Sequence, residues 1–210
     1  NTSKDLIMNR ILNTSLLILL TTQNILAFDI NKLDVPENFK VEIFVEDIEA
    51  PRQMAEGEDG YIFVGSKKGL VYAMRDHDGN GKIDDVDIIA KDLNDSSGVA
   101  YHEGSLFIAE INKVWRIDNI EKQLADFNDI VLQKTLVTED LPSDAWHGRK
   151  WIMIDKDGSI LLNVGAPCNV CLKEDERYAT ILRYRDNSWI IEARGVRNTV
   201  GFDIHPTNNN

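Results

Sequence analysis

The sequence predicts an all-β fold, and three observations carry this prediction. Short apolar runs of four or five residues, rich in Val, Ile and aromatic side chains, recur along the chain. An acidic residue followed by glycine separates several of these runs, as in the tight turns that join antiparallel strands. Helical spacing of apolar residues is almost absent, and we expect only a short helical turn around residues 121–127.

The apolar runs form three repeats of one pattern, in which a strand, an acidic-glycine turn, a second strand and a third strand follow one another. The turn glycines Gly60, Gly104 and Gly158 lie 44 and 54 residues apart. The expected strands are residues 52–55, 61–65 and 70–74, then 98–101, 106–109 and 114–117, then 151–154, 160–164 and 181–184.

A fourth apolar segment accompanies the repeats, at residues 41–45, 86–90, 134–138 and 189–193. Four antiparallel strands every ~40–50 residues are typical of a β-propeller blade. We therefore expect about three blades within residues 28–210. The segment 41–45 would complete a blade outside this chain, and residues 200–203 would open a further inner strand. Because propellers have about four to eight blades, we read the chain as part of a larger ring.

The N-terminal residues resemble an export signal. Met8 and Arg10 precede an apolar run at residues 16–20, and Ala27 offers a small residue for cleavage. We expect residues 1–27 to be upstream sequence plus signal peptide, and the protein to be periplasmic or secreted; a membrane anchor is the alternative. After signal removal we expect no membrane span.

Charge and cysteine content narrow the function classes. The 210 residues include 35 acidic and 23 basic ones, giving a net charge of −12, which argues against a nucleic-acid partner. Cys168 and Cys171 form the only CxxC, with no second pair for a zinc site and Leu172 where haem attachment needs His. An exported protein allows a disulfide here, and the sequence leaves its formation open.

Loops that join each outer strand to the next inner strand should gather around one end of a propeller channel, and here they are polar. They comprise residues 51–52, 94–98, 141–150 and 194–199. His147 lies at the start of an inner strand, close to Arg149, and we expect it to face Arg197 and Asn198. One base and one fixed cation can remove a hydroxyl proton and stabilise the developing charge.

A second group of oxygen donors has the spacing of a calcium-binding loop. Counted from Asp76, oxygen-bearing side chains occupy the first, third, fifth and ninth positions. Gly stands at the sixth position and an apolar residue at the eighth. The twelfth position departs from the template, because it is Asp rather than Glu. We expect a structural calcium site with the ligands Asp76, Asp78, Asn80, Lys82, Asp84 and Asp87, although an acidic turn without an ion has the same sequence.

The chain closely resembles sorbosone-dehydrogenase-like members of the glucose/sorbosone dehydrogenase family. The resemblance is closest in residues 146–150, 165–171, 177–180 and 193–202. Segments 41–74, 76–84 and 98–110 fit the same family. The resemblance implies a six-bladed propeller that uses pyrroloquinoline quinone to oxidise C1 of a sugar, an aldose or sorbosone. The electron acceptor does not follow from it.

The resemblance also implies roles for individual residues. His147 resembles the base, Arg197 the arginine that contacts substrate, and Asn198 a quinone ligand. Two positions depart from the family pattern, because Trp146 stands where an acidic residue orients the histidine and Ser97 where a glutamine contacts the quinone. These two residues and Arg149 complete the expected cofactor-binding set. The family's remaining ligands lie in a C-terminal half that this chain lacks, and we expect the chain alone to be inactive.

Two other functions stay open at this stage. A propeller without catalysis, which binds a glycan or a protein, would explain Trp146 next to the histidine. A calcium-dependent hydrolase of the lactonase type would need carboxylates around the channel, whereas these loops offer mainly His and Arg.

Overall fold

The computed structural model describes residues 29–125 and 132–205, and the chain forms two compact units, Asn1–Glu42 and Ile43–Asn210. The described part of the first unit holds one short 3-10 helix, η1 (Ile30–Lys32), which is capped by the Asp29 side chain. The expected signal peptide at residues 1–27 lies outside the described residues, and it stays a prediction. No described helix combines the length and apolar character needed to cross a bilayer.

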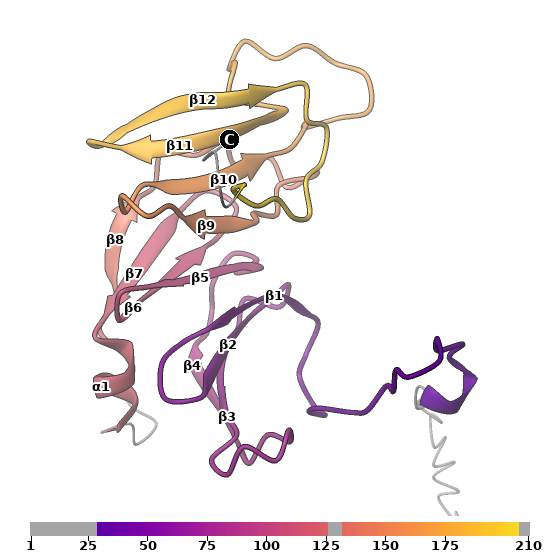
Figure 1. Ribbon diagram of the computed structural model, residues 1–210. Coiled ribbons are helices and arrows are strands. Elements are labelled where there is room, and N and C mark those ends of the chain that lie inside the picture. The colour runs from indigo at the N-terminus through magenta and orange to yellow at the C-terminus, as the bar shows by residue number, and fades with distance from the viewer. Residues whose placement is uncertain (1–28, 126–131, 206–210) are drawn as a thin grey trace, which may run out of the picture. The chain divides into compact units, whose positions relative to one another are not determined.

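The second unit contains three four-stranded antiparallel sheets, and the strands of each sheet pair in chain order (Figure 1). The prediction of an all-β fold is confirmed. One short helix, α1 (Ile120–Ala125), follows β7 where a helical turn was expected. The strands are β1 (Pro51–Glu56), β2 (Tyr61–Ser66), β3 (Val71–Arg75), β4 (Asp85–Ala90), β5 (Gly98–His102), β6 (Ser105–Ala109), β7 (Val114–Asp118), β8 (Thr135–Thr138), β9 (Ile152–Ile154), β10 (Ile160–Val164), β11 (Thr180–Arg185) and β12 (Ser188–Arg194).

The outer strand of each sheet carries the same irregularity. In β4, β8 and β12 the pairing with the preceding strand skips one residue, which is Ile89, Val137 and Glu192 respectively. An extra residue on one strand is a β-bulge, which bends the strand and increases its twist. The recurrence of the bulge at one place in all three sheets shows that the sequence repeat is a structural repeat.

Two expected strands are absent from the described structure. Residues 41–45 and 200–203 have no strand geometry. In the second unit, the carbonyl of Phe44 accepts one hydrogen bond from the N–H of Ile83, at 3.3 Å. Apolar alternation alone does not make a strand, because the backbone groups also need a neighbouring strand to pair with, and none of the three described sheets provides one for these segments.

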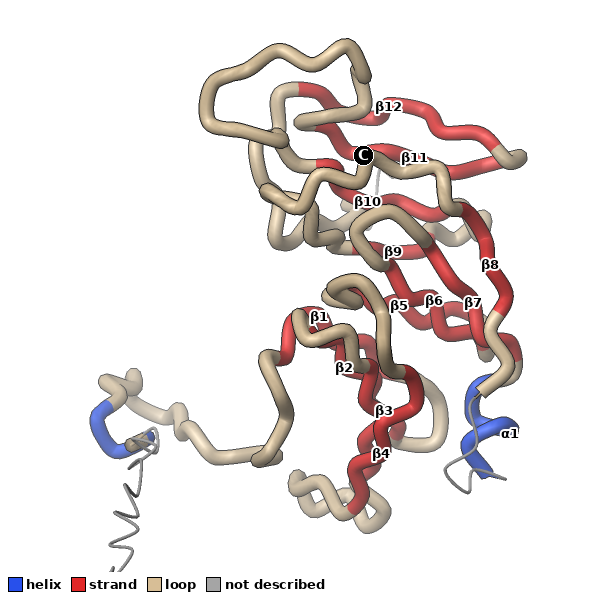
Figure 2. Tube along the Cα trace, turned by 180° about the vertical axis from the view of Figure 1, so that it is seen from behind, coloured by secondary structure: helices blue, strands red, loops and turns tan. Residues whose placement is uncertain are grey.

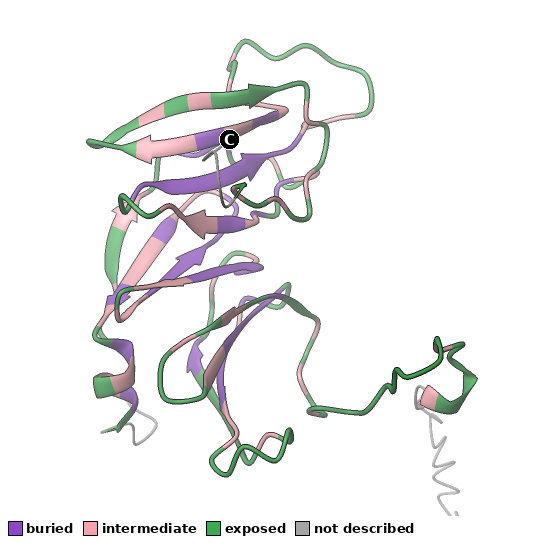
Figure 3. Ribbon diagram, in the orientation of Figure 1, coloured by how far each residue is buried: buried purple, intermediate pink, exposed green. Residues whose placement is uncertain are grey.

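The three sheets are held together by apolar side chains from facing strands. Along β6, Leu106 and Ile108 pack toward the first sheet, whereas Phe107 packs toward the third. Alternate residues of a strand point to opposite faces, and the inner strands β5 and β6 are therefore mostly buried, whereas β8 is not (Figure 3). This explains why these inner strands read as continuous apolar runs rather than as an alternation of apolar and polar residues.

The first strands of the three sheets, β1, β5 and β9, lie next to one another in that order (Figure 2). Gln53 in β1 connects all three. Its backbone N–H donates to the Ser97 carbonyl at 3.1 Å, and its side chain donates to the carbonyl of Ile152 at 2.6 Å and accepts from the N–H of Ile152 at 3.0 Å. The buried Gln53 amide therefore replaces a strand partner for Ile152 and joins the first sheet to the third.

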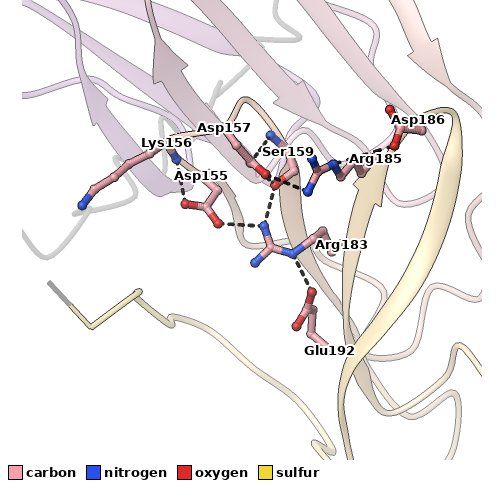
Figure 4. A network of polar contacts seen from close by, with 8 residues as sticks. All are labelled: Asp155, Lys156, Asp157, Ser159, Arg183, Arg185, Asp186 and Glu192. Carbon is pink, nitrogen blue, oxygen red and sulfur yellow. Dashed lines mark hydrogen bonds and ion pairs between the residues drawn. The ribbon is translucent and has the colours of Figure 1, made fainter. Parts of the chain in front are cut away.

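A polar network fastens the turn between β9 and β10 (Figure 4). Arg183 in β11 donates to Asp155 at 2.7 Å and also contacts Ser159 in the turn and Glu192 in β12. Asp157 accepts hydrogen bonds from Ser159, and these bonds lower the pKa of the Asp157 carboxyl. The network ties the β9–β10 turn to β11 and β12.

Candidate functional site

The four polar loops meet, as expected, at one cavity of about 480 Å³. Each inner strand begins at this cavity, because β1, β5 and β9 lie side by side. Its wall comprises Pro51, Arg52, Gln53, Ser97, His147, Arg149, Lys150, Trp151, Asn198, Thr199 and Val200. Among the residues predicted from the sequence, His147, Ser97, Arg149 and Asn198 therefore lie in one cavity wall.

His147 is held in a defined orientation. Its Nδ1 lies 2.8 Å from the carbonyl oxygen of Ala166. Because a carbonyl oxygen can only accept, this contact requires a proton on Nδ1, and in the neutral ring Nε2 then keeps a free lone pair. The backbone of His147 has φ +50°, a conformation that costs ~1 kcal/mol or more in a non-glycine residue. The imidazole is thus prepared to accept a proton at Nε2.

Asp95 organises the neighbouring part of the wall. One of its carboxylate oxygens accepts from Arg149 Nε at 3.0 Å, and the other accepts from the Ser97 hydroxyl. Asp95 was part of an expected loop but had no expected role. Its carboxylate holds in place two of the predicted residues, which lie in the loops leading into β5 and β9.

Lys150 is the most deeply buried cation of the wall. Its side chain is 3 % exposed, and the ammonium donates to the carbonyl of Gly148 at 2.5 Å. Burial lowers the pKa of Lys150 to about 7, and the nearby Asp95 opposes this effect. A charged residue two positions before the apolar strand β9 was the only signal for it in the sequence.

Several hydrogen-bond donors of the wall have no acceptor within the described chain. The buried Thr199 hydroxyl has no partner, and Lys150 uses one of its three donors. Arg52 donates from Nη1 to the adjacent Pro51 carbonyl. Together with Arg149, the described wall has three basic side chains and no Asp or Glu of its own, and Asp95, which pairs with Arg149, lies next to it. Such a wall suits an anionic ligand that is rich in carbonyl or carboxylate oxygens.

Two predicted residues lie beside the cavity but not in its wall. Arg197 donates to Asn169 through both terminal nitrogens, at 3.2 Å to the carbonyl and 2.6 Å to the side chain. The Trp146 ring is 55 % exposed and lies 5.4 Å from the His147 ring. The orientation of these side chains depends on neighbouring loops, which the sequence pattern did not resolve.

No carboxylate orients His147 within the described part of the chain. Asp144, three residues before His147, accepts a hydrogen bond from Tyr178 and pairs with Lys173 at 3.6 Å. The Tyr178 hydrogen bond lowers the pKa of Asp144. The Ala166 carbonyl takes the place of an orienting acid.

Cys168 and Cys171 form a disulfide, which answers the question that the sequence left open. It closes a small ring, which contains Asn169, in the loop between β10 and β11.

The calcium-type loop brings three carboxylates together. Oxygens of Asp76, Asp78 and Asp84 lie within 4.8 Å of one another. The N–H groups of Gly81 and Gly79 donate to Asp76, both at 2.8 Å, and the bond from Gly81 is the main cause that lowers the pKa of this carboxyl.

Three further expected ligands lie in and beyond this loop. Asn80 and Lys82 both lie within it, and the Asn80 side chain accepts from the N–H of Lys82 at 2.9 Å. Asp87 is not part of the cluster, because β4 has already begun at Asp85 and the extended backbone carries the twelfth position away from the loop.

Sequence comparison yields one related curated protein and no family model. No protein-family model matches this chain. An uncharacterized protein of Borreliella burgdorferi is 32 % identical over 186 residues, which are 84 % of this chain and 47 % of the relative. The chain thus spans about half the length of the curated relative it matches.

Solved structures that are similar to this chain include the following three. The PQQ domain of pyranose dehydrogenase from Coprinopsis cinerea, in its holo form, has a TM-score of 0.55 and 14 % identity, over 67 % of this chain and 34 % of that one. A calcium structure of a Trichoderma reesei enzyme of family AA12 has a TM-score of 0.53 and 14 % identity, over 67 % and 36 %. A Thermus thermophilus protein assigned as an oxidoreductase (glucose dehydrogenase) has a TM-score of 0.53 and 18 % identity, over 81 % and 59 %. These proteins share the fold of this chain.

Proposed function

We propose that this chain is part of a pyrroloquinoline-quinone-dependent sugar dehydrogenase, built as a six-bladed propeller of which it supplies three blades. The substrate would be an aldose or sorbosone that is oxidised at C1. The fold shared with a PQQ domain and with a protein assigned as a glucose dehydrogenase supports this proposal. The disulfide supports export to the periplasm or the medium, because disulfides persist in oxidising compartments.

The observation that carries the proposal is the chemistry of the cavity wall. Pyrroloquinoline quinone is an anion with carboxylate and carbonyl oxygens, and the wall offers unpaired donors and three basic side chains, of which Arg149 also pairs with the Asp95 carboxylate outside the wall. Arg149, Asn198 and Ser97 would hold the cofactor, and Trp146 would cover it from the rim. When bound, the quinone would accept the hydride that leaves C1 of the sugar.

Proton removal and contact with the sugar would be the roles of residues of this chain. His147 would remove the hydroxyl proton at Nε2, since Nδ1 is occupied by the Ala166 carbonyl. Arg197 would contact the sugar next to this base. The described cavity wall contains no Asp or Glu. This argues against the lactonase-type alternative, which needs carboxylates to hold a metal in the channel.

Calcium would have a structural role in the loop between β3 and β4. Asp76, Asp78 and Asp84 would be its carboxylate ligands, with the Asn80 side chain and the Lys82 carbonyl completing the set. Asp87 would take part only through a shift of β4. The cavity lies at the start of the inner strands, whereas this loop follows β3, and the ion would therefore not contact the substrate.

The test uses the whole protein, incubated with calcium and pyrroloquinoline quinone. Quinone binding is followed by a titration of absorbance, and turnover by dye reduction with a panel of aldoses and sorbosone. We expect sugar-dependent reduction that falls at least ~100-fold in His147→Ala, as for the loss of a general base. His102→Ala is the matched control, because His102 ends β5 at its turn and does not line the cavity.

A second candidate function is a binding module without catalysis, and the exposed Trp146 ring beside an imidazole without an acidic partner favours it. Quinone binding without turnover would support this candidate and refute the dehydrogenase. Absence of any quinone binding would refute the cofactor assignment itself.

A further inference from the structure

The loop between β10 and β11 is a large excursion from the third sheet, and the cavity uses none of it (Figure 1). It runs from residue 165 to residue 179. The side chains of Val170 and Leu172 are 97 % and 100 % exposed, and burial therefore does not hold this part of the loop. The Cys168–Cys171 disulfide and hydrogen bonds to neighbouring loops hold it instead.

One of these neighbours is Arg197. Its guanidinium donates to two acceptors of the same residue, the carbonyl and the side-chain oxygen of Asn169, at 3.2 and 2.6 Å. Two donors on a planar group fix both its position and its orientation. Asn169 lies inside the disulfide ring, and the cross-link restricts the rotation of its backbone.

The other neighbour is His147, and the contact runs through Ala166. The Ala166 carbonyl faces His147 Nδ1 at 2.8 Å, while the Ala166 N–H donates to the Arg197 carbonyl at 2.7 Å. The preceding Gly165 has no room for a side chain, because a Cβ there would lie 2.4 Å from the His147 carbonyl and 3.2 Å from that of Arg197. The backbone of Gly165 and Ala166 therefore lies between the loop that carries His147 and the loop that carries Arg197, and it contacts both.

We infer that the disulfide-closed loop is a positioning element of the site, in which Asn169 holds the Arg197 guanidinium and Ala166 holds the His147 ring. This inference rests on the proposed function, because it takes His147 and Arg197 as working residues. Neither Asn169 nor Ala166 touches the reacting atoms. The loop sets the separation of the base and the cation, and it keeps Nε2 of the imidazole as the proton acceptor.

The first test needs neither cofactor nor sugar. Phenylglyoxal modifies accessible arginines, and peptide mass spectrometry reports its rate at Arg197. We expect Asn169→Ala to raise this rate severalfold and Asn169→Asp to restore it, since a carboxylate also accepts from guanidinium. Val170→Ala is the control, because its exposed side chain lies in the same ring. Equal rates in wild type and Asn169→Ala would overturn the inference.

The disulfide is tested by the double variant Cys168→Ser and Cys171→Ser. We expect a faster reaction at Arg197 and, by ¹⁵N NMR of the imidazole, a mixture of tautomers at His147 in place of the Nδ1-protonated form. An unchanged labelling rate together with an unchanged tautomer would refute a role for the cross-link.

Kinetics then connect the loop to turnover. In the quinone-loaded whole protein, Asn169→Ala should raise KM for the sugar more than it lowers kcat, and Asn169→Asp should restore it. A protein that neither binds quinone nor oxidises sugar would refute the proposed function, whereas the labelling and tautomer results would still decide whether the loop positions the two residues.

Discussion

The buried amine of Lys150 should make the stability of the protein depend on pH. Burial lowers its pKa to about 7 in the folded state, whereas an unfolded lysine has a pKa of ~10.4. Between these values the unfolded chain binds more protons, and the free energy of unfolding therefore rises with pH. Below pH 7 both states carry the charge, and the full cost of burying it remains.

The size of the effect follows from the two pKa values. Each pH unit above 7 contributes ~1.36 kcal/mol, which amounts to about 2–3 kcal/mol between pH 6 and pH 9. The Lys150→Met variant has a similar volume without the charge. We expect its stability relative to the wild type to be about 2–3 kcal/mol greater at pH 6 than at pH 9.

Urea unfolding of both proteins at the two pH values measures this difference. Lys156→Met is the matched control, because Lys156 lies exposed in the turn after β9, and it should show no such dependence on pH. If Lys150→Met changes the free energy of unfolding equally at both pH values, the amine is not buried as a titrating group and the reasoning fails.

Three further predictions concern single contacts. Gly165→Ala should destabilise the protein by ~1–3 kcal/mol in urea unfolding, because the new Cβ would lie 2.4 Å from the His147 carbonyl; unchanged stability would contradict the close packing. Gln53→Leu should cost about 2–4 kcal/mol, since it leaves the N–H and carbonyl of Ile152 unpaired, and a smaller loss would mean that water replaces the amide. Asp76→Asn should weaken calcium binding at least ~10-fold by calorimetry, because the loss of one carboxylate charge lowers the affinity of such loops, while equal affinity in both proteins would refute the calcium site.

Most of the strands could be predicted because both the turn glycines and the apolar runs are local features. The strands on either side of Gly60, Gly104 and Gly158 all formed. Residues 41–45 and 200–203 have similar apolar character but no strand geometry. The pairing of a strand depends on a neighbour that its own residues do not specify.

In the site, too, the features set by nearby residues could be predicted, and those set by distant residues could not. The convergence of the four loops follows from the order of strands within each sheet, and it was predicted. The direction of Arg197 was not, because it depends on Asn169, 28 residues earlier in a loop without repeats. Lys150 was also missed, since a single lysine in a polar loop looks the same whether it is buried or exposed.

The contact between Gln53 and Ile152 joins residues that are 99 positions apart. At ~5–20 residues per second, a ribosome needs roughly 5–20 s to add the residues that separate them. During that interval the first two sheets can form, but the Gln53 amide still lacks its partner. Closure of this bridge therefore has to wait for the third sheet, and a chaperone that recognises unpaired inner strands would have time to bind before the cavity wall is complete.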